Sequence, residues 1–388
     1  MTGRKLLCLN NSIDVSQRTY NAVRQTPDLP AFDNFDFKRS PVNQLDLHEF
    51  YNNTVRPDSL TIRSAVIKTA ENFALPERVK MLHLKDLFCQ DLEIWDKSSG
   101  LPWREIGYET KGDIKKEPEA IRRVRKFAHL VKNGENIHFP DCLVYATSHT
   151  CEGGEYKVET VWEYPATIAF MEAIFAVPLI RAYQASTFES KPIAYGFDTA
   201  TGGMERLIKR FSKQEAFYIG LHFKKFDKTV PVWLIIDAFD IMMINMSFTY
   251  YEEYEKYGSG ATDARRMILM WCTLQEYFVK TTIRTGDGKR YKKFSGIPSG
   301  SYFTELVGSI VNTIIINWLS FEQFGHYPLD VVALGDDSLI SSTKRWDFVK
   351  CEELLNKIGM TLNMEKCEQN ENLGRLKFCG NIIGSGTP

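Results

Sequence analysis

The spacing of apolar residues along the chain changes between a helical and a strand-like period, and it predicts helices separated by short hairpins. Apolar positions recur every three to four residues in several windows, which is typical of helices with one buried face. These windows are residues 60–73, 78–92, 117–132, 167–183, 304–324 and 346–358, with one more from Pro231 to about residue 257. Pro231 suits a first helical turn, and Gly359 suits the end of the helix before it.

Shorter runs carry the alternation that is typical of strands. They are residues 156–162, 215–223, 331–334, 339–340, 360–362 and 376–378. Glycines at 286 and 288 predict a further hairpin turn before residues 291–294. Because helices alternate with hairpins and not with regular βαβ units, the pattern predicts the α+β class.

Composition adds size and charge to this picture. A chain of 388 residues with 44% hydrophobic content can bury a large core and suggests two or three units. The net charge of −1 gives no overall basic field, so any nucleic-acid partner has to be met by local patches. Two candidate patches are the basic runs at 111–132 and 284–293, although solvated surface faces explain such runs equally well.

Cysteine usage and hydropathy exclude several classes of protein. None of the eight cysteines forms a CxxC pair, which indicates reduced thiols in a cytosol-like compartment. The His and Cys residues between 138 and 151 fit no standard zinc spacing. The N-terminus lacks the apolar core of a signal peptide, and the most apolar stretch, 230–246, contains Asp237 and Asp240. We therefore expect a buried helix there and no membrane span.

The first candidate for chemistry is Gly-Asp-Asp-Ser at 335–338, which lies between two apolar runs and predicts a β-hairpin with two carboxylates at its tip. Asp336 and Asp337 repel each other there unless a cation lies between them. Two Mg²⁺ ions roughly 3.5–4 Å apart, held by carboxylates, are what two-metal phosphoryl transfer requires. Asp-rich turns are common, so a purely structural turn remains an alternative for this motif taken alone.

A second candidate lies upstream, where Ser-Gly-Ile-Pro-Ser-Gly-Ser at 295–301 is followed by Thr304 and Asn312 on a predicted helix. Small residues let the backbone approach a ligand, and hydroxyl groups near a helix N-terminus can meet sugar and phosphate oxygens. An ordinary helix cap is the alternative. The acidic hairpin that follows favours a nucleotide site.

Together these segments resemble motifs B and C of viral RNA-dependent RNA polymerases, most closely those of the partitivirus group, which replicate segmented double-stranded RNA genomes. Other segments agree in order: 226–235 resembles the second half of motif A, 362–366 motif D and 378–380 motif E. Residues 100–103 and 107–113 resemble the region where the template enters. The resemblance covers about residues 95 to 385.

The resemblance implies roles for individual residues. Asp336 and Asp337 would be catalytic and would hold Mg²⁺ or Mn²⁺, while His222 stands at the position of the first motif A aspartate. Lys366 would protonate the leaving pyrophosphate. The implied nucleotide-binding residues are Asp227, Ser299, Gly300, Thr304, Asn312 and Lys157, of which Asp227, Ser299 and Asn312 would read the ribose hydroxyls. The implied RNA-binding residues are Ser99, Gly100 and Lys111.

The implied fold is a right hand, with an antiparallel palm sheet flanked by helices and mainly helical fingers. We expect an N-terminal extension or fingers at 1–95, fingers at 96–214, palm with motif A at 215–240, a fingers insertion at 241–290, and palm with motifs B to E at 291–388. The segment after motif E is too short for a thumb, so we expect the thumb to be absent from this chain.

Two positions depart from the family's pattern in charge. His222 replaces an aspartate that would bridge both metal ions, and a neutral imidazole cannot bridge two Mg²⁺ as a carboxylate does. Glu159 stands where motif F carries an arginine that faces the triphosphate, which turns attraction into repulsion. Lys157 or Arg181 could compensate for that change.

The resulting prediction is RNA-templated RNA synthesis in the replication of a double-stranded RNA virus. Its implied partners are RNA, ribonucleoside triphosphates and a capsid protein, and its implied location is the cytoplasm or the virion. The main alternative is a non-catalytic, truncated derivative that retains at most RNA binding. Reverse transcription fits less well, because Asp227 and Asn312 would read ribose hydroxyls and Gly335 precedes the aspartates. A role in protein interaction alone leaves both motifs unexplained.

Overall fold

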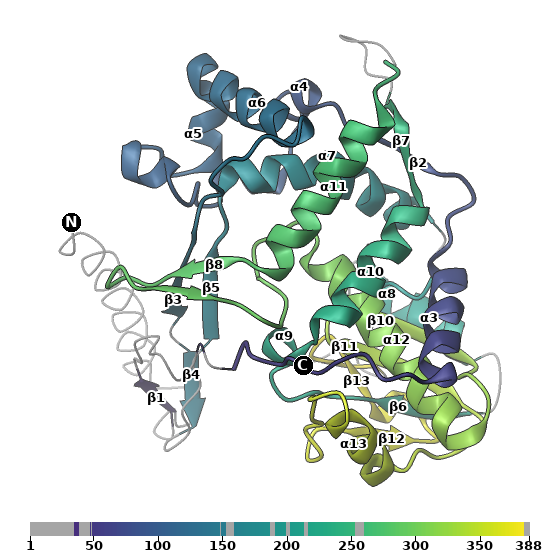
Figure 1. Cartoon of the computed structure of the whole chain (residues 1–388). Coiled ribbons are helices and arrows are strands. Elements are labelled where there is room, and N and C mark those ends of the chain that lie inside the picture. Colours follow the sequence, from purple (N-terminus) through teal and green to yellow (C-terminus); the bar gives the residue numbers. More distant parts are fainter. Residues whose placement is uncertain are drawn as a thin grey trace.

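The computed structural model describes residues 35–38, 47, 49–147, 149–152, 159–186, 191–198, 202–212, 216–252 and 260–383. Helices and sheets are mixed along the chain, which confirms the α+β class (Figure 1). The helices are α3 (Leu60–Phe73), α4 (Leu84–Leu87), α5 (Lys111–Lys116), α6 (Pro118–Lys132), α7 (Ala166–Ala185), α8 (Gly203–Phe211), α9 (Phe226–Thr229), α10 (Val232–Ile244), α11 (Ala264–Val279), α12 (Thr304–Phe324) and α13 (Phe348–Asn356). The strands are β1 (Phe35–Lys38), β2 (Val79–Met81), β3 (Cys142–Thr147), β4 (His149–Glu152), β5 (Glu159–Glu163), β6 (Phe217–Gly220), β7 (Met246–Tyr251), β8 (Thr282–Arg284), β9 (Arg290–Lys292), β10 (Asp330–Leu334), β11 (Asp337–Ser342), β12 (Glu368–Asn370), β13 (Lys377–Phe378) and β14 (Asn381–Ile382).

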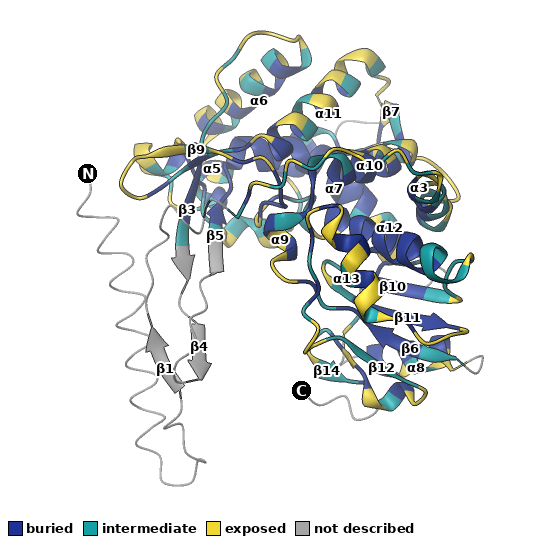
Figure 2. Ribbon diagram, turned by 60° about the horizontal axis from the view of Figure 1, so that its bottom comes forward, coloured by how far each residue is buried: buried dark blue, intermediate teal, exposed yellow. Residues whose placement is uncertain are grey.

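The sheet that carries the acidic hairpin has the antiparallel order β10-β11-β6-β12. Its two faces bury different partners. Ile340 belongs to the main core on one face, and its neighbour Leu339 packs with Leu207 of α8 on the other. Because both faces are covered, the central strands read as continuous apolar runs in the sequence. Figure 2 shows these strands buried between α12 and the segment around α8.

The main core lies among α7, α10, α11 and α12, and large aromatic side chains fill it. Trp271 stacks edge-on against Phe239, Phe303 and Phe175 with ring centroids 5.3–5.6 Å apart, which is a favourable arrangement for aromatic pairs. Two helices of this core, α7 and α12, are long and apolar enough to cross a membrane. However, 83% of the apolar window of each is buried inside the protein, as in core helices of a globular fold.

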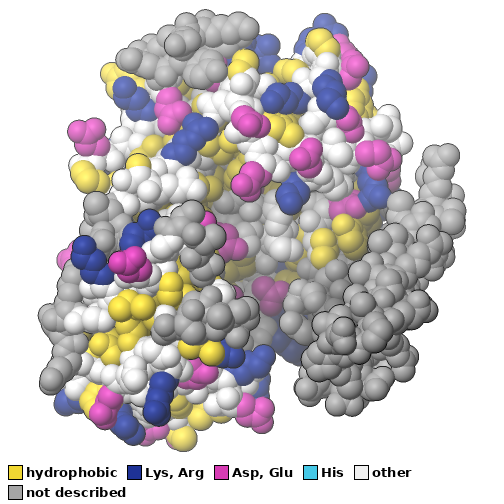
Figure 3. All heavy atoms as spheres, turned by 180° about the vertical axis from the view of Figure 1, so that it is seen from behind, with side chains coloured by type: hydrophobic (Ala, Val, Ile, Leu, Met, Phe, Trp, Pro, Cys, Tyr) yellow, Lys and Arg dark blue, Asp and Glu magenta, His cyan; other side chains and the backbone are white. Residues whose placement is uncertain are grey.

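A second sheet, ordered β5-β3-β8-β9, lies beside the helical core. Strands β8 and β9 form the hairpin expected around the glycines at 286 and 288, and β8 pairs parallel to β3. Strand β5 forms one edge of this sheet, and the chain continues from it into α7 (Figure 1). Seen from behind, Lys and Arg side chains are interspersed with Asp and Glu over the surface, in keeping with the small net charge (Figure 3).

Several expected elements match the structure and others differ. The helices at 60–73 and 304–324 have the expected bounds. The helix expected at 78–92 is wrong, because the strand β2 and the single turn α4 occupy that segment. The helix from Pro231 ends at Ile244, after which β7 pairs with β2. Pairing with a distant strand outweighs the local helical pattern in both segments. Of the strand expected at 360–362, only a bridge between Leu362 and Phe223 is present.

Candidate functional site

The two aspartates lie at the tip of the β10–β11 hairpin, in a tight turn of residues 335–337 that we call the carboxylate turn. Leu334 pairs with Asp337, which leaves Gly335 and Asp336 as a two-residue connection. Gly335 has φ +60°, a left-handed conformation that glycine adopts without strain. The Asp336 side chain is exposed, and that of Asp337 is partly buried.

Helix α12 packs against the carboxylate turn and hydrogen-bonds to its backbone. The Ser309 hydroxyl accepts a hydrogen bond from the Gly335 N–H at 2.9 Å, and the Asn312 amide donates to the Gly335 and Asp336 carbonyls at 3.2 and 2.9 Å. A Cβ on Gly308 would lie 3.1 Å from the Gly335 Cα, so the glycine allows this close approach. These contacts with the backbone of the turn fix the position of the two aspartates relative to α12.

Asn312 was predicted to read the ribose, and the structure gives it a different environment. Its side chain is fully buried and its amide nitrogen bonds to the carboxylate turn. Its Oδ1 has no hydrogen-bond partner among the described residues. In this arrangement Asn312 orients the turn, and direct contact with a nucleotide stays a prediction.

A third carboxylate lies beside the turn, and the motif comparison missed it. Glu305, in the first turn of α12, has Oε2 only 3.0 Å from where a Cβ on Gly335 would lie. Desolvation, and then the charges of Asp336 and Asp337, raise the pKa of Glu305. The signal available in the sequence was its spacing, because residues 305, 308 and 312 fall on one helix face.

His222 lies next to Asp337. Strand β6 ends at Gly220, two residues before His222, and pairs with β11, which begins at Asp337. Desolvation and then Asp336 raise the pKa of Asp337, while the charge of His222 lowers it. The His222 backbone carbonyl accepts a hydrogen bond from the Asn363 N–H at 2.7 Å, which ties this position to the segment expected to form motif D.

The oxygen ligands and negative charge of the carboxylate turn are suited to binding a divalent cation. The charges of Asp336 and Asp337 raise the pKa of Glu305, and the charge of Asp336 raises the pKa of Asp337, so a bound dication would relieve the repulsion among these carboxylates. Mg²⁺ usually keeps several waters and binds through one or two carboxylates plus substrate phosphates, so two aspartates suffice as protein ligands. Within the described part of the chain, no group of three or more His, Cys, Asp or Glu residues is arranged as a ready-made metal site.

The loop before α12, residues 295–301, lies against the motif A segment; we call it the Ser-Gly loop. The Ile297 N–H donates to the Asp227 carbonyl at 2.7 Å, and the Ser295 hydroxyl donates to the Lys228 carbonyl at 2.7 Å. A Cβ on Gly296 would lie 2.4 Å from the Asp227 carbonyl oxygen, so only glycine fits there. The structure thus brings Asp227 and the Ser-Gly loop together, as the predicted ribose site requires.

The remaining predicted nucleotide-binding residues differ in how far they are available. Ser299 and Gly300 are exposed at the outer side of the Ser-Gly loop. The Thr304 hydroxyl is used within the protein, since it lies 2.8 Å from the Pro298 carbonyl. Lys366 is exposed on a turn. Lys157 lies outside the described residues, and so does the side chain of Glu159.

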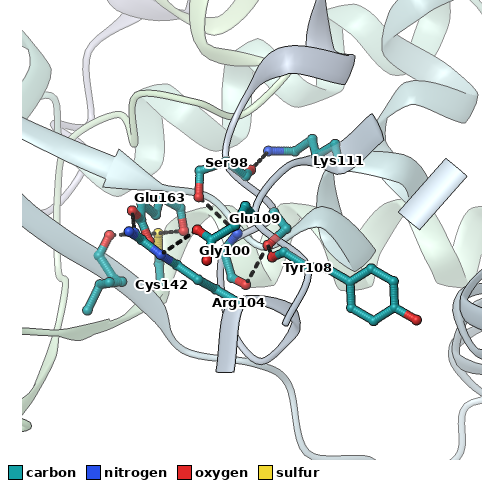
Figure 4. Close-up of polar contacts among 10 residues, drawn as sticks. Ser98, Gly100, Arg104, Tyr108, Glu109, Lys111, Cys142 and Glu163 are labelled. Atoms are coloured by element: carbon teal, nitrogen blue, oxygen red, sulfur yellow. Dashed lines mark hydrogen bonds and ion pairs between the residues drawn. The ribbon is translucent and has the colours of Figure 1, made fainter. Parts of the chain in front are cut away.

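The predicted RNA-binding residues are internal, in a segment at 98–113 that we call the template-entrance segment (Figure 4). Ser99 is fully buried and its hydroxyl donates to the Tyr108 carbonyl at 2.5 Å. The Lys111 ammonium is buried and donates to the Ser98 carbonyl at 2.5 Å. A Cβ on Gly100 would lie 2.9 Å from the Glu163 and Tyr164 carbonyl oxygens. In this arrangement the side chains of these residues hold the segment in place, and contact with RNA stays a prediction.

The two basic runs are partly neutralised by neighbouring acids. On α6, Glu119 pairs with both Arg122 and Arg123. In the second run, Arg284 pairs with Glu105 at 3.2 Å, and Arg290 pairs with Asp141 at 2.7 Å. Exposed pairs of this kind contribute little to stability and remain open to exchange with phosphates. RNA binding by either run stays a prediction.

Comparison with known proteins agrees with this geometry. Residues 50–386 match the family described as viral RNA-dependent RNA polymerase. The chain is 27% identical over 251 residues to the RNA-directed RNA polymerase of Cryptosporidium parvum virus 1, covering 63% of this chain and 43% of that protein. It is 23% identical over 244 residues to the enzyme of White clover cryptic virus 1 (56% and 39% covered). It is 24% identical over 282 residues to that of Atkinsonella hypoxylon virus (62% and 42% covered).

These alignments cover about two fifths of the length of each of those relatives. The family match covers most of the present chain, including the carboxylate turn, the Ser-Gly loop and the template-entrance segment. The chain therefore belongs to the viral RNA-dependent RNA polymerase family.

Proposed function

We propose that this chain carries the nucleotidyl-transfer centre of an RNA-templated RNA polymerase that replicates a double-stranded RNA genome. The observation that carries the proposal is the carboxylate turn held by α12 next to the Ser-Gly loop and Asp227. In the corresponding right-hand architecture, residues 215–240 and 291–388 form the palm. Residues 96–214 and 241–290 form the fingers, with 1–95 as an extension.

The residues of the proposed site have two kinds of role, which are to balance charge and to position the substrate. Asp336 and Asp337 would hold the divalent cation, which when bound supplies charge neutralisation at the phosphates. Asp227 and Ser299 would hold the ribose hydroxyls, which distinguish RNA precursors from DNA precursors. Lys366 would give a proton to the departing pyrophosphate. The remaining contribution is positioning, as is usual in phosphoryl transfer.

One observation favours a second candidate, a non-catalytic RNA-binding derivative. His222, near Asp337, stands where the family places a carboxylate, so one negative metal ligand is missing from the site. The RNA, ribonucleotide and capsid partners, and a cytoplasmic or virion location, follow from the first candidate and are part of the proposal. An absence of membrane association remains an expectation.

The test is incorporation of labelled ribonucleotides on a primed RNA template, in Mg²⁺ and in Mn²⁺, beside the variant Asp336→Ala. We expect incorporation by the wild type and none by the variant, because Asp336 is exposed at the tip of the turn. RNA binding measured on both proteins provides the control for folding. Intact RNA binding without incorporation above the variant would reject catalysis and support the second candidate.

A further inference from the structure

A carboxylate is buried directly behind the Ser-Gly loop. Glu172 lies in the middle of α7 and its side chain has 0% exposure. Its Oε1 accepts a hydrogen bond from the Tyr164 hydroxyl at 2.7 Å. Its Oε2 accepts from the Ser301 hydroxyl at 2.8 Å and from the Tyr302 backbone N–H at 3.0 Å. Three donors converge on one carboxylate, which is the arrangement that stabilises its ionised form.

The Ser-Gly loop depends on these contacts for its place. Ser301 follows Gly300, and its hydroxyl also accepts a hydrogen bond from the Phe303 N–H at 3.1 Å. Gly300 has φ +92°, and a Cβ there would lie 3.0 Å from the Trp162 carbonyl and 3.3 Å from the Tyr164 Cβ. The exposed end of the loop is therefore seated on Tyr164 and anchored from behind by Glu172.

Tyr164 contacts the template-entrance segment with its backbone. Its carbonyl oxygen accepts a hydrogen bond from the Lys111 ammonium at 3.4 Å and would lie 2.9 Å from a Cβ on Gly100. The preceding residue, Glu163 at the end of β5, forms an ion pair with Arg104 of the same segment (Figure 4). A single residue thus contacts the template-entrance segment on one side and the Ser-Gly loop on the other.

We propose that Glu172, together with Tyr164, is a positioning residue that sets the Ser-Gly loop for the incoming nucleotide and joins it to the template-entrance segment. The proposal rests on the proposed function in that the loop contacts a nucleotide. Neither residue touches the reacting atoms. Their effect is transmitted through Ser301, which is adjacent to Gly300 and Ser299 in the loop.

The ionisation of Glu172 gives this role a pH dependence. Burial raises its pKa to about 7, against the opposing effects of the Tyr164, Ser301 and Tyr302 hydrogen bonds and the Lys111 charge. A protonated carboxyl carries its own O–H, so one of its oxygens accepts less well from the three donors. The hydrogen bonds that hold the loop therefore weaken below about pH 7. The other titratable groups that act on this carboxyl are Lys111, Cys142, Tyr164, Tyr277 and Tyr302.

These neighbours do not change charge where Glu172 does. Burial raises the pKa of Cys142, Tyr164, Tyr277 and Tyr302, so these side chains stay neutral across pH 6 to 8. Burial lowers the pKa of Lys111 to about 8, which leaves it mostly charged at pH 7. Lys293 also titrates in this window, because burial lowers its pKa to about 7. Its charge forms as the pH falls and strengthens its hydrogen bond to the Gly296 carbonyl, so it would slow loop exchange at pH 6. Faster loop exchange at pH 6 than at pH 7.5 is therefore assigned to Glu172.

The deciding experiment is amide hydrogen exchange of residues 297–303 at pH 6 and pH 7.5, corrected for intrinsic exchange. In the wild type we expect this loop to exchange about fivefold faster at pH 6, because charge-assisted hydrogen bonds are about twice as strong as neutral ones. Glu172→Gln should abolish this acceleration at pH 6, since its side chain has nearly the same shape and cannot ionise. Asp86→Asn, which removes another buried carboxylate, should keep the wild-type difference.

The result that overturns the proposal is faster loop exchange at pH 6 that persists in Glu172→Gln. An equal acceleration over the whole of α12 in that variant would also overturn it, because the effect would then be global. Ser301→Ala keeps the carboxylate and provides a second test, with faster loop exchange expected at pH 7.5. Exchange requires no catalysis, so it decides the positioning role even if no variant incorporates nucleotides.

A second arm applies if the wild type is active. The KM for ribonucleotides should rise several-fold in Glu172→Gln at pH 7.5, with a smaller change in kcat, because the loop binds the substrate and does not take part in the chemical step. The wild-type pH profile of kcat/KM should lose its ionisation near pH 7 in the variant. Unchanged KM and an unchanged profile would reject the link between Glu172 and the nucleotide.

Discussion

His222 sets the charge balance of the carboxylate turn. It lies near Asp337, where its charge lowers the pKa of that aspartate. An aspartate at the same place would add negative charge to a site that already contains Asp336, Asp337 and Glu305. The same substitution thus favours a bound dication and disfavours the metal-free protein, because like charges close together repel.

We therefore predict that His222→Asp raises affinity for Mn²⁺ by about tenfold or more, since a close charge pair near a protein surface contributes several kcal/mol. The metal-free variant should unfold at a lower temperature than the wild type. Calorimetric titration with Mn²⁺ and thermal unfolding measure the two effects. His222→Asn, which adds no charge, is the control. Equal Mn²⁺ affinity in all three proteins would contradict a metal role for this position.

At the scale of elements, α12 positions the main parts of the proposed site. Glu305, Gly308, Ser309 and Asn312 follow one another at helical spacing, so they line one face of the helix below the carboxylate turn. The start of the same helix carries the Ser-Gly loop. One rigid helix therefore sets the distance between the metal-binding and nucleotide-binding parts of the proposed site.

Gly308→Ala tests this role of α12. The added Cβ would lie 3.1 Å from the Gly335 Cα, so the carboxylate turn has to move by a few tenths of an ångström. We expect Mn²⁺ affinity and incorporation to fall by about tenfold, since small displacements of reacting groups are costly.

Gly220→Ala on β6 is the matched control, because its nearest heavy atom would lie at 3.9 Å, an ordinary contact distance. The control should behave like the wild type in both measurements. A loss of the same size in Gly220→Ala would show general destabilisation and not a displaced turn.

At the scale of the whole molecule, two buried ionisable groups change the free energy of unfolding in opposite directions as the pH rises. Burial raises the pKa of Glu172 to about 7 and lowers the pKa of Lys293 to about 7. Lys293 is almost completely buried and donates to the Gly296 carbonyl at 2.6 Å, at the other end of the Ser-Gly loop. Each charged group hydrogen-bonds to the Ser-Gly loop, and burying its charge lowers the free energy of unfolding.

The pH dependence of unfolding follows from linkage. The contribution of Glu172 is present below its ordinary pKa of 4.5 and is lost as the pH rises to about 7, a loss of about 3 kcal/mol. The contribution of Lys293 is present above 10.5 and is lost as the pH falls to about 7. These two residues together therefore favour a minimum of stability near pH 7.

Urea unfolding at pH 5, 7 and 9 measures this minimum. Glu172→Gln should flatten the decrease between pH 5 and 7 and leave the alkaline side unchanged. Lys293→Met should flatten the increase between pH 7 and 9 and leave the acid side unchanged. Slopes that are the same in the wild type and in each variant would show that neither residue has the pKa assigned to it.

Local sequence signals account for most of the individual elements and for the main chemical groups of the proposed site. The bounds of α3 and α12, the β10–β11 hairpin and the two aspartates at its tip follow from periodicity and turn chemistry, which act over a few neighbouring residues. The family motifs added Asp227 and the Ser-Gly loop, which the structure brings together.

Packing between segments that are distant in the chain sets which side chains are buried and what they contact. Lys111 and Asn312 carry polar groups that suggested ligand contacts, yet packing places both inside the protein. Glu172 and Ser301 are 129 positions apart, and no local pattern relates them. The end of α10 likewise depends on β2, a strand far away in the chain. Burial and long-range pairing arise from the packing of distant segments, which is why local sequence signals do not contain them.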